Sequence, residues 1–269
     1  MTPETLTSNV NMKEHFASIA DVYREVRTTD VEPIRYMKRE LGDRLRLRAA
    51  DIGCGAGRYD VLLFDHLPGL HLTCVDTNEA MLREARTLFT NNGITDFETM
   101  VSTVEDLSVR QKSYHAIFSF NAVHHFDFDV FLEKSRHALK EEGYLFIYTR
   151  LPRHNAETIW GQFFPNFLKK ETRLYELGDM YRRIVATEGL HFEAVRYFRY
   201  HRKASLDRLI TQARKKHYST LAFYGEEEFE HALAEFEVGL KNFFDDPDAI
   251  EWFDQNVLIQ ARRIADGPG

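Results

Sequence analysis

Hydrophobic and polar residues in the middle of the chain alternate with two different periods. Five short apolar runs have the length and composition of buried strands: 45–52, 71–75, 97–103, 114–120 and 144–148. Three intervening segments repeat apolar residues at helical spacing: 59–67, 78–89 and 128–143. Strands that alternate with helices at this spacing predict a parallel sheet covered by helices on both faces.

Further helices and strands are predicted on either side of this region. Apolar residues recur at helical spacing from 12 to 27, and a second helix is expected between Asp30 and Gly42, with Pro33 in its first turn. Beyond residue 150 the pattern predicts, in order, a poorly periodic aromatic segment (151–173), a helix (174–188), a strand (192–200), helices (205–244) and a last strand (256–264). Because the helices interrupt what is otherwise a strand pair, we expect a sheet of seven strands.

Composition indicates a soluble globular protein. The 269 residues are 43% hydrophobic and 29% charged, and 35 Lys and Arg against 42 Asp and Glu give a net charge of −7, which weakens any overall attraction to polyanions. The two cysteines, Cys54 and Cys74, show neither disulfide-scaffold nor zinc spacing. With no secretory signal and no apolar run of membrane-spanning length, we expect a cytoplasmic protein.

A glycine loop joins the first strand of the core to the next helix. Its sequence, Asp51-Ile-Gly-Cys-Gly-Ala-Gly57, does not continue as a dinucleotide fingerprint, because position 58 is Arg58 instead of glycine. Backbone N–H groups in such loops hold nucleotide-like cofactors. Asp76 ends the second strand 19 residues beyond Gly57, where a carboxylate accepts hydrogen bonds from ribose hydroxyls. The alternatives are a plain strand-to-helix turn and, for Asp76, a helix cap.

Five motifs stand in the order and spacing of a known enzyme class. They are Asp51–Gly57, Asp76, Val104-Glu-Asp-Leu107, Ser119-Phe-Asn-Ala-Val-His-His-Phe126 and Leu139-Lys-Glu-Glu-Gly-Tyr-Leu-Phe146. In these motifs the chain resembles the class I S-adenosylmethionine-dependent methyltransferases, and it is most similar to the group that includes the ubiquinone and menaquinone biosynthesis methyltransferases. The resemblance covers about residues 12–200 and the final strand.

The resemblance implies a fold, a cofactor and a division of the chain. The fold is α/β, a Rossmann-like, doubly wound, mostly parallel seven-stranded sheet with a helical cap. The cofactor is S-adenosyl-L-methionine, with S-adenosyl-L-homocysteine as product. The expected parts are N-terminal cap helices (1–44), the cofactor-binding core (45–150), an aromatic cap segment with the sixth-strand region (151–204), a helical cap insertion (205–254), and the last strand and tail (255–269).

The resemblance also implies which residues contact the cofactor. Gly53 and Gly55 would approach its methionine part, Asp51 would orient the amino group, and Asp76 would hold the ribose. The whole expected set is Arg27, Asp51, Gly53, Cys54, Gly55, Gly57, Asp76, Thr77, Met81, Val104, Glu105, Asp106, Asn121 and Ala122. Thr103 departs from the pattern, because relatives often carry an acid before the adenine-contacting residue. Lys140-Glu-Glu-Gly143 also departs from the usual Lys-Pro-Gly-Gly turn.

The chemistry implied is an in-line displacement, whose barrier falls mainly through alignment of the reacting atoms. A base helps when the acceptor is a hydroxyl or an acidic carbon, and His124 and His125 follow the fourth strand, where ligand sites occur. Tyr23 and Arg27 resemble positions that close over the cofactor, so the expected catalytic residues are His124, His125 and Tyr23. Alternatively, one histidine packs and the other caps the helix near Asp127, Tyr23 is a core residue and Arg27 is solvated.

Other chemistries are disfavoured. No metal is expected, because no acidic or histidine partner stands at ligand spacing. Enzymes that methylate planar amide or adenine nitrogens typically carry Asn/Asp-Pro-Pro-Tyr/Phe at the end of the fourth strand, where this chain has Ser119-Phe-Asn-Ala122. Nicotinamide chemistry is a distant alternative.

The acceptor must be recognised by the second half of the chain. Residues 151–269 hold 19 of the 35 aromatic residues, and Trp160, Phe163, Phe164 and Phe167 either line a substrate or form the core of a cap. Residues 196–217 carry a net charge of +7 and residues 226–254 a net charge of −10. These segments either neutralise one another or leave a basic rim for a carboxylate, a phosphate or RNA.

These patterns together predict a methyltransferase that acts on a small organic acceptor, aromatic or anionic, as a monomer or homodimer without membrane or nucleic-acid partners. One alternative is a tRNA or rRNA methyltransferase that uses the basic segment 196–217. The other is a non-catalytic protein that binds S-adenosylmethionine.

Overall fold

The computed structural model describes residues 29–108 and 111–265, which form two compact units. The core unit comprises residues 29–149, 175–198 and 257–265, and the helical unit comprises residues 150–174 and 199–256. The predicted helix over 12–27, with Tyr23 and Arg27, lies outside the described residues.

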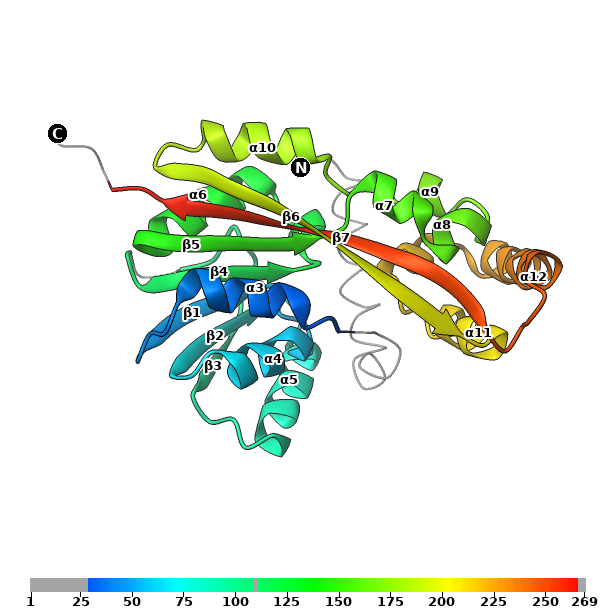
Figure 1. Cartoon of the computed structure of the whole chain (residues 1–269), viewed down its shortest axis with the longest axis horizontal. Helices are drawn as coiled ribbons and strands as arrows, with labels where there is room; N and C mark the ends of the chain where they lie inside the picture. Colours follow the sequence, from blue (N-terminus) through cyan, green and yellow to red (C-terminus); the bar gives the residue numbers. More distant parts are fainter. Residues whose placement is uncertain (1–28, 109–110, 266–269) are drawn as a thin grey trace. The chain divides into compact units, whose positions relative to one another are not determined.

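Within the described residues the chain forms one sheet of seven strands (Figure 1). The strands are β1 (Leu47–Ile52), β2 (Leu70–Asp76), β3 (Phe97–Val101), β4 (Tyr114–Phe120), β5 (Leu139–Thr149), β6 (Leu190–Ala204) and β7 (Ile250–Arg263). Their order is β3-β2-β1-β4-β5-β7-β6. β1 pairs in parallel with β2 and β4, β2 with β3, and β4 with β5, whereas β7 is antiparallel to β5. The predicted Rossmann-like, mostly parallel seven-stranded α/β fold is confirmed.

The helices divide between the two units. Those of the core unit are α3 (Glu32–Leu41), α4 (Arg58–His66), α5 (Glu79–Asn91), the 3₁₀ turn η1 (Val123–His125), α6 (Phe128–Ala138) and α10 (Leu177–Ala186). Those of the helical unit are α7 (Pro152–Glu157), α8 (Ile159–Phe163), α9 (Phe167–Lys170), α11 (Leu206–Arg214), the 3₁₀ turn η2 (Ser219–Phe223) and α12 (Glu226–Phe243). In the described part of the chain, none of these helices is both long enough and apolar enough to cross a bilayer.

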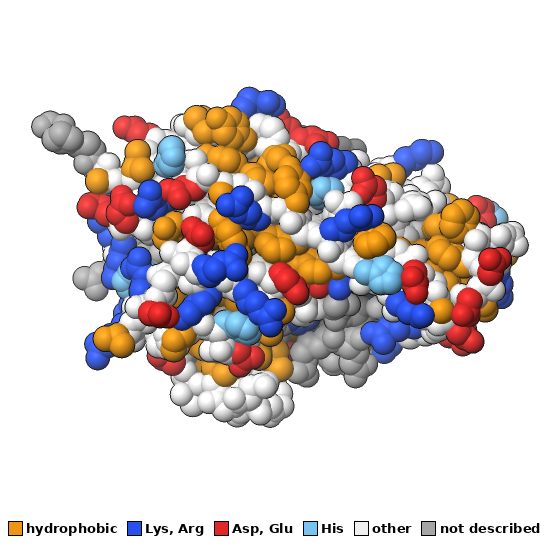
Figure 2. All heavy atoms as spheres, in the orientation of Figure 1, with side chains coloured by type: hydrophobic (Ala, Val, Ile, Leu, Met, Phe, Trp, Pro, Cys, Tyr) orange, Lys and Arg blue, Asp and Glu red, His pale blue; other side chains and the backbone are white. Residues whose placement is uncertain are grey.

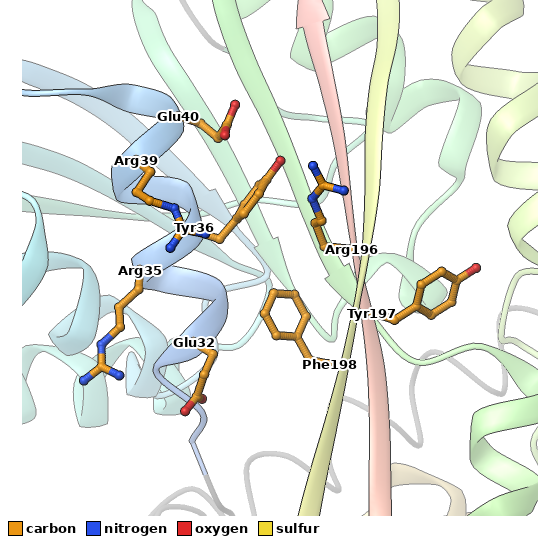
Figure 3. A pocket seen from close by; sticks show the side chains of 8 residues that line it. All are labelled: Glu32, Arg35, Tyr36, Arg39, Glu40, Arg196, Tyr197 and Phe198. Atoms are coloured by element: carbon orange, nitrogen blue, oxygen red, sulfur yellow. The ribbon is translucent and has the colours of Figure 1, made fainter.

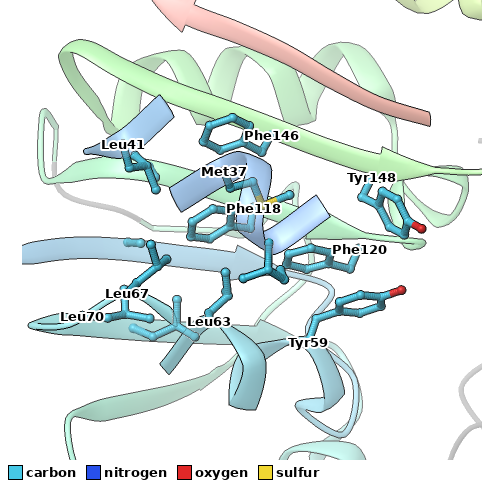
Figure 4. Packing of buried hydrophobic residues seen from close by; sticks show 14 of the residues in the cluster. Met37, Leu41, Tyr59, Leu63, Leu67, Leu70, Phe118, Phe120, Phe146 and Tyr148 are labelled. Atoms are coloured by element: carbon cyan, nitrogen blue, oxygen red, sulfur yellow. The ribbon is translucent and has the colours of Figure 1, made fainter. Parts of the chain in front are cut away.

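Aromatic rings form the centre of the core beneath α3, α4 and α5 (Figure 4). Phe118 and Phe120 point to the same face of β4 because strand side chains alternate. The Phe120 ring stacks on Tyr59 of α4 at 4.5 Å, and Phe118 stacks on Phe146 of β5 at 5.8 Å. α6 lies behind the sheet in Figure 1, so both faces of the strands are covered and their sequences are nearly continuous in apolar residues.

The helix predicted to end at Gly143 is shorter, and the strand after it is longer. α6 ends at Ala138 and β5 begins at Leu139. Tyr114 pairs with Leu139 and Ala116 pairs with Tyr144, so residues 140–143 form a bulge opposite β4. Leu139 continues the helical spacing of α6, yet its side chain is buried in the strand, which explains why periodicity alone misplaced the boundary.

Three further differences occur in the second half of the chain. The aromatic segment 151–173 contains three short helices, because Pro152 starts α7 and Pro165 follows the end of α8. β6 extends beyond the predicted 192–200, and β7 begins at Ile250 instead of 256. In the first half of β7, Glu251, Asp254 and Gln255 are polar and interrupt the apolar pattern.

The helical unit has a hydrophobic core of its own. Trp160, Phe164 and Phe167 are buried with residues of α11 and α12, and the Trp160 ring stacks on Phe236 at 5.0 Å. Phe163 is half-buried against this core. The interpretation of the aromatic cluster as core is therefore the one that the structure supports.

Replacing Phe118 with alanine should lower the free energy of unfolding by about 3–5 kcal/mol, because the change leaves a cavity in the fully buried ring cluster. Urea denaturation measures the difference. Val185→Ala on α10 is the control, because that side chain is 54% exposed and its loss should change stability by no more than about 0.5 kcal/mol. Similar losses for the two variants would contradict the placement of Phe118 in the core.

Candidate cofactor-binding site

The glycine loop is fastened to the neighbouring strand by its backbone. The N–H groups of Gly53 and Cys54 both donate to the carbonyl oxygen of Val75 on β2, at 2.8 and 3.0 Å. Gly53 has φ +79°, and a Cβ there would lie 2.5 Å from Cβ of Ala122, at the end of β4. Gly55 has φ +55°, and apart from its chain neighbours a Cβ there would meet no atom of residues 29–108 and 111–265 within 4 Å. The loop is therefore packed at Gly53 and open at Gly55, where a ligand has room.

Asp76 lies directly beside this loop. Its Oδ2 accepts a hydrogen bond from Gly55 N at 2.9 Å and its Oδ1 accepts one from Asn78 N at 2.8 Å. Burial raises the pKa of Asp76, and these backbone donors counteract the rise. A carboxylate has about four lone-pair directions, so both oxygens retain acceptor capacity for ribose hydroxyls.

Asp76 does not cap α5. The N-cap is Asn78, whose Oδ1 accepts hydrogen bonds from Ala80 N at 2.9 Å and Met81 N at 3.4 Å. The alternative that assigned capping to Asp76 is wrong, because its oxygens are turned toward Gly55 N and Asn78 N. The carboxylate is thus placed by the loop, and the helix is started by its neighbour.

A second carboxyl group lies behind the loop. Asp51 on β1 and Asp60 on α4 are both buried, and Asp51 shares a hydrogen bond with Asp60. Burial, followed by the charge of Asp60, raises the pKa of Asp51 well above its ordinary value, and burial raises the pKa of Asp60 to about 6. Oδ1 of each carboxyl group has no hydrogen-bond partner among the described residues. Two buried acids with unsatisfied oxygens favour a cationic ligand group beside them.

The two cysteines join the same cluster. Sγ of Cys74 donates to Oδ2 of Asp60 at 3.6 Å, and the ligand-type atoms of Cys54, Asp60 and Cys74 all lie within 4.8 Å of one another. The positions of the cysteines in the sequence did not predict that Cys54 lies beside Asp60 and Cys74. Burial raises the pKa of Cys54 well above its usual range. For Cys74, a hydrogen bond with Cys54 lowers the pKa, but burial and the charge of Asp60 outweigh this effect and raise the pKa to about 12. At neutral pH both thiols are therefore protonated and can act as hydrogen-bond donors.

The residues expected around the adenine follow β2 and β3. Ser102 N donates to the carbonyl oxygen of Asp76 at 3.1 Å, which brings the segment after β3 next to the ribose position. Thr103 Oγ1 donates to Oδ2 of Asp106 and accepts from Asp106 N, both at 3.1 Å. The side chains of Met81 and Val104 are buried, and those of Thr77, Glu105 and Asp106 are exposed. Thr103 thus fixes the turn where relatives often carry an acid, and Glu105 is the more available carboxylate.

The two candidate histidines lie in η1, directly after β4. Their side chains are half-buried and the ring centroids are 4.1 Å apart. Asn121, before them, has φ +53° and donates its N–H to the carbonyl oxygen of Tyr148 at 2.7 Å. The N-cap of α6 is the carboxylate of Asp127, so the alternative that a histidine caps this helix is wrong.

The sequence analysis missed Asp60. Its position was detectable, because Asp60, Leu63 and Leu67 follow helical spacing on the buried side of α4, where an acid is unexpected. Only the fold places it against Asp51, because the two residues lie on different elements. Of the expected cofactor residues, Asp51, Cys54, Gly55 and Asp76 are brought together, and Tyr23 and Arg27 lie outside the described residues.

Comparisons with known proteins found a family match and shared folds. Residues 50–147 match the model of a methyltransferase domain family, and no curated protein matches the sequence. A candidate methyltransferase from Bacillus halodurans C-125 has a TM-score of 0.62 at 16% identity, over 86% of this chain and 99% of its own. At this identity the likeness establishes the fold.

Two further structures were solved with S-adenosylhomocysteine. Phosphoethanolamine N-methyltransferase 2 from Haemonchus contortus has a TM-score of 0.54 at 16% identity, over 87% of this chain and 52% of its own. Geranyl diphosphate C-methyltransferase from Streptomyces coelicolor A3(2) has a TM-score of 0.54 at 14% identity, over 86% of this chain and 78% of its own. Residues 50–147 thus match a methyltransferase domain and the chain shares the fold of these enzymes, which together support a class I S-adenosylmethionine-dependent methyltransferase.

Proposed function

We propose that the enzyme transfers the methyl group of S-adenosylmethionine to a small organic acceptor. The observation that carries this proposal is the pairing of the basic segment 196–217 with acids of the same unit. His201 and Lys203 approach Glu251 at 3.0 and 3.4 Å, Arg202 approaches Asp254 at 3.3 Å, and Arg214 approaches Glu230 at 3.9 Å. Cations engaged in this way are poorly available for the phosphate contacts that dominate RNA binding, so an RNA acceptor is not favoured.

The chain's residues fit the cofactor. The open space at Gly55 and the acceptor oxygens of Asp76 would receive its ribose side, and the unsatisfied Oδ1 of Asp51 would receive its amino group. When bound, S-adenosylmethionine supplies a methyl group on a positively charged sulfur, which is already activated for displacement. The protein's contribution is then to hold the acceptor in line and to exclude water. His124 and His125, after the end of β4, would take a proton from an acceptor that has one to lose.

The acceptor class follows from chemistry shared with similar enzymes. The two relatives named for their substrates act on phosphoethanolamine and geranyl diphosphate, both small anions. The motif resemblance to the ubiquinone and menaquinone group points to an aromatic acceptor. We infer a small acceptor with an acidic or aromatic part that is not methylated at a planar amide or adenine nitrogen, in keeping with the Ser119-Phe-Asn-Ala122 motif.

Incubation with methyl-labelled S-adenosylmethionine tests the proposal. Pools of small phenols, carboxylic acids and phosphate esters should accept label, and total RNA should not. Label in RNA would replace the proposal with the nucleic-acid alternative. Cofactor binding by calorimetry with no transfer to either pool would favour the non-catalytic alternative.

Gly55→Ala should abolish cofactor binding and leave the fold intact. Apart from its chain neighbours, the new methyl group meets no atom of the described residues, so the stability cost is only the roughly 1–2 kcal/mol of a left-handed alanine, but it fills the space assigned to the cofactor. Gly93→Ala is the control, because Gly93 has φ +69° and equal space but lies outside the site. Calorimetry with S-adenosylhomocysteine should show at least about a tenfold loss for Gly55→Ala alone. Equal affinities for both variants would reject the site.

Cofactor binding should depend on pH through Asp51 and Asp60. Their raised pKa values mean that the folded chain keeps a proton on this pair where the unfolded chain has lost it. A cationic amino group beside Asp51 favours the ionised carboxyl, so binding releases the proton, and affinity should fall as the pH falls from about 7 to about 5. The stability of the chain without cofactor should change in the opposite direction. Because the folded chain then binds more protons than the unfolded chain, the free energy of unfolding should rise as the pH falls through about 6.

Asp60→Asn separates these effects. The variant removes the charge of Asp60, which contributes to the raised pKa of Asp51, so titration with S-adenosylmethionine in buffers of different ionisation enthalpy should show a smaller proton release at pH 7 for the variant than for the wild type. The variant without cofactor should be more stable at about pH 7, by on the order of 1–3 kcal/mol. Asp65→Asn, at an exposed position of the same helix, should match the wild type in both measurements. Equal proton release by wild type and Asp60→Asn would overturn the role of the pair.

A further inference from the structure

A pocket of about 620 Å³ opens on the core unit between α3 and β6 (Figure 3). Its walls include Arg35, Tyr36, Arg39 and Glu40 of α3 with Arg196 and Phe198 of β6. None of these residues belongs to the expected cofactor set. The volume is that of a small-molecule site. Basic side chains gather over α3 on this face of the molecule (Figure 2).

Two guanidinium groups are positioned by one aromatic ring. Those of Arg39 and Arg196 lie over the ring of Tyr36, at 5.6 and 5.4 Å from its centroid. The ring is itself fixed, because it is buried and its hydroxyl donates to Oε1 of Gln260 on β7 at 2.7 Å. Cations from two elements, which would otherwise repel, are thus held on a rigid platform in advance of any ligand.

Two carboxylates, Glu32 and Glu40, line the pocket together with the arginines. Nε2 of Gln260 donates to Glu40 at 3.1 Å and to Glu193 at 3.4 Å, and Glu193 also pairs with Arg262 at 2.6 Å. Among the described residues, none of the guanidinium groups of Arg35, Arg39 and Arg196 is in an ion pair. Arg35 and Arg39 stand four residues apart on α3, where like charges destabilise a helix. The lining of the pocket therefore holds three arginines outside ion pairs and two glutamates, an excess of one positive charge.

We propose that this pocket binds a small phosphate ester, separately from the methyl-transfer site. The planar forks of Arg39 and Arg196 suit bidentate contact with a phosphate group, and Arg35 adds a third cation at the rim. Phe198 is half-buried against Tyr148, with ring centroids 6.0 Å apart, and supplies an apolar wall for the organic part of the ligand. Arg196 is the member of the basic segment that lies in the core unit, so this site does not use the cations that are paired in the helical unit.

Titration calorimetry with phenyl phosphate tests the proposal. The wild type should bind it saturably, with a dissociation constant of about 1 mM or lower, and should bind inorganic phosphate more weakly. Arg39→Lys and Arg196→Lys keep the net charge but lose the forks, so each should weaken phenyl phosphate binding by about fivefold or more. Arg83→Lys on α5 is the matched control and should bind as the wild type, because Arg83 is exposed and outside the pocket.

Three results would overturn the proposal. The first is no saturable binding by the wild type, and the second is unchanged binding by both lysine variants, which would reduce the effect to net charge. The third is equal affinity for phenyl phosphate and inorganic phosphate, which would remove the organic part of the ligand from the site. Thermal unfolding of each variant, and its binding of S-adenosylhomocysteine, report whether the fold and the other site are intact. Because these readouts are separate, failure here leaves the methyltransferase proposal unaffected.

Discussion

The carbonyl oxygen of Val75 organises the cofactor site. By accepting hydrogen bonds from both Gly53 N and Cys54 N, it holds the loop after β1 against the end of β2. That attachment brings Gly55 N to the carboxylate of Asp76, and it presses Gly53 so closely on Ala122 that only a glycine fits. Three parallel strands thus meet at one point, which is where ligands bind in sheets of this type. The candidate cofactor site therefore depends on backbone hydrogen bonds and on a glycine at position 53, where a larger residue would not fit.

Behind this loop, two buried carboxyl groups lower the stability of the fold. Buried carboxyl groups with unsatisfied oxygens destabilise a fold, and Asp51 and Asp60 form such a pair. The thiol of Cys74 offsets part of the cost by donating to Asp60. The large apolar core beneath α3, α4 and α5 supplies the stability that allows it. The cost is consistent with the proposal that the amino group of the cofactor binds beside this pair.

The helical unit is stabilised by contacts among its own residues. Its aromatic residues pack into their own core, and its basic and acidic segments satisfy one another across β6 and β7. The net charges of +7 over residues 196–217 and −10 over residues 226–254 are therefore partly neutralised by ion pairs and overstate the electrostatic potential at the surface. The three arginines of the pocket beside α3 differ from these paired cations, because none of them is in an ion pair among the described residues.

The sequence alone determined the order of strands and helices in the core, the glycine loop and the acid at the end of β2. These features are local: apolar periodicity, turn glycines and a fixed spacing leave few alternatives. Leu139 shows the limit, because one residue satisfied both the spacing of α6 and the burial of β5. Only the tertiary structure decided that Asp60 faces Asp51, that Asn78 and not Asp76 caps α5, and that Arg39 and Arg196 share the ring of Tyr36. Whether these side chains meet depends on how the elements that carry them pack together. The free energy of that packing depends on the whole sheet, so no local pattern in the sequence predicts the contacts.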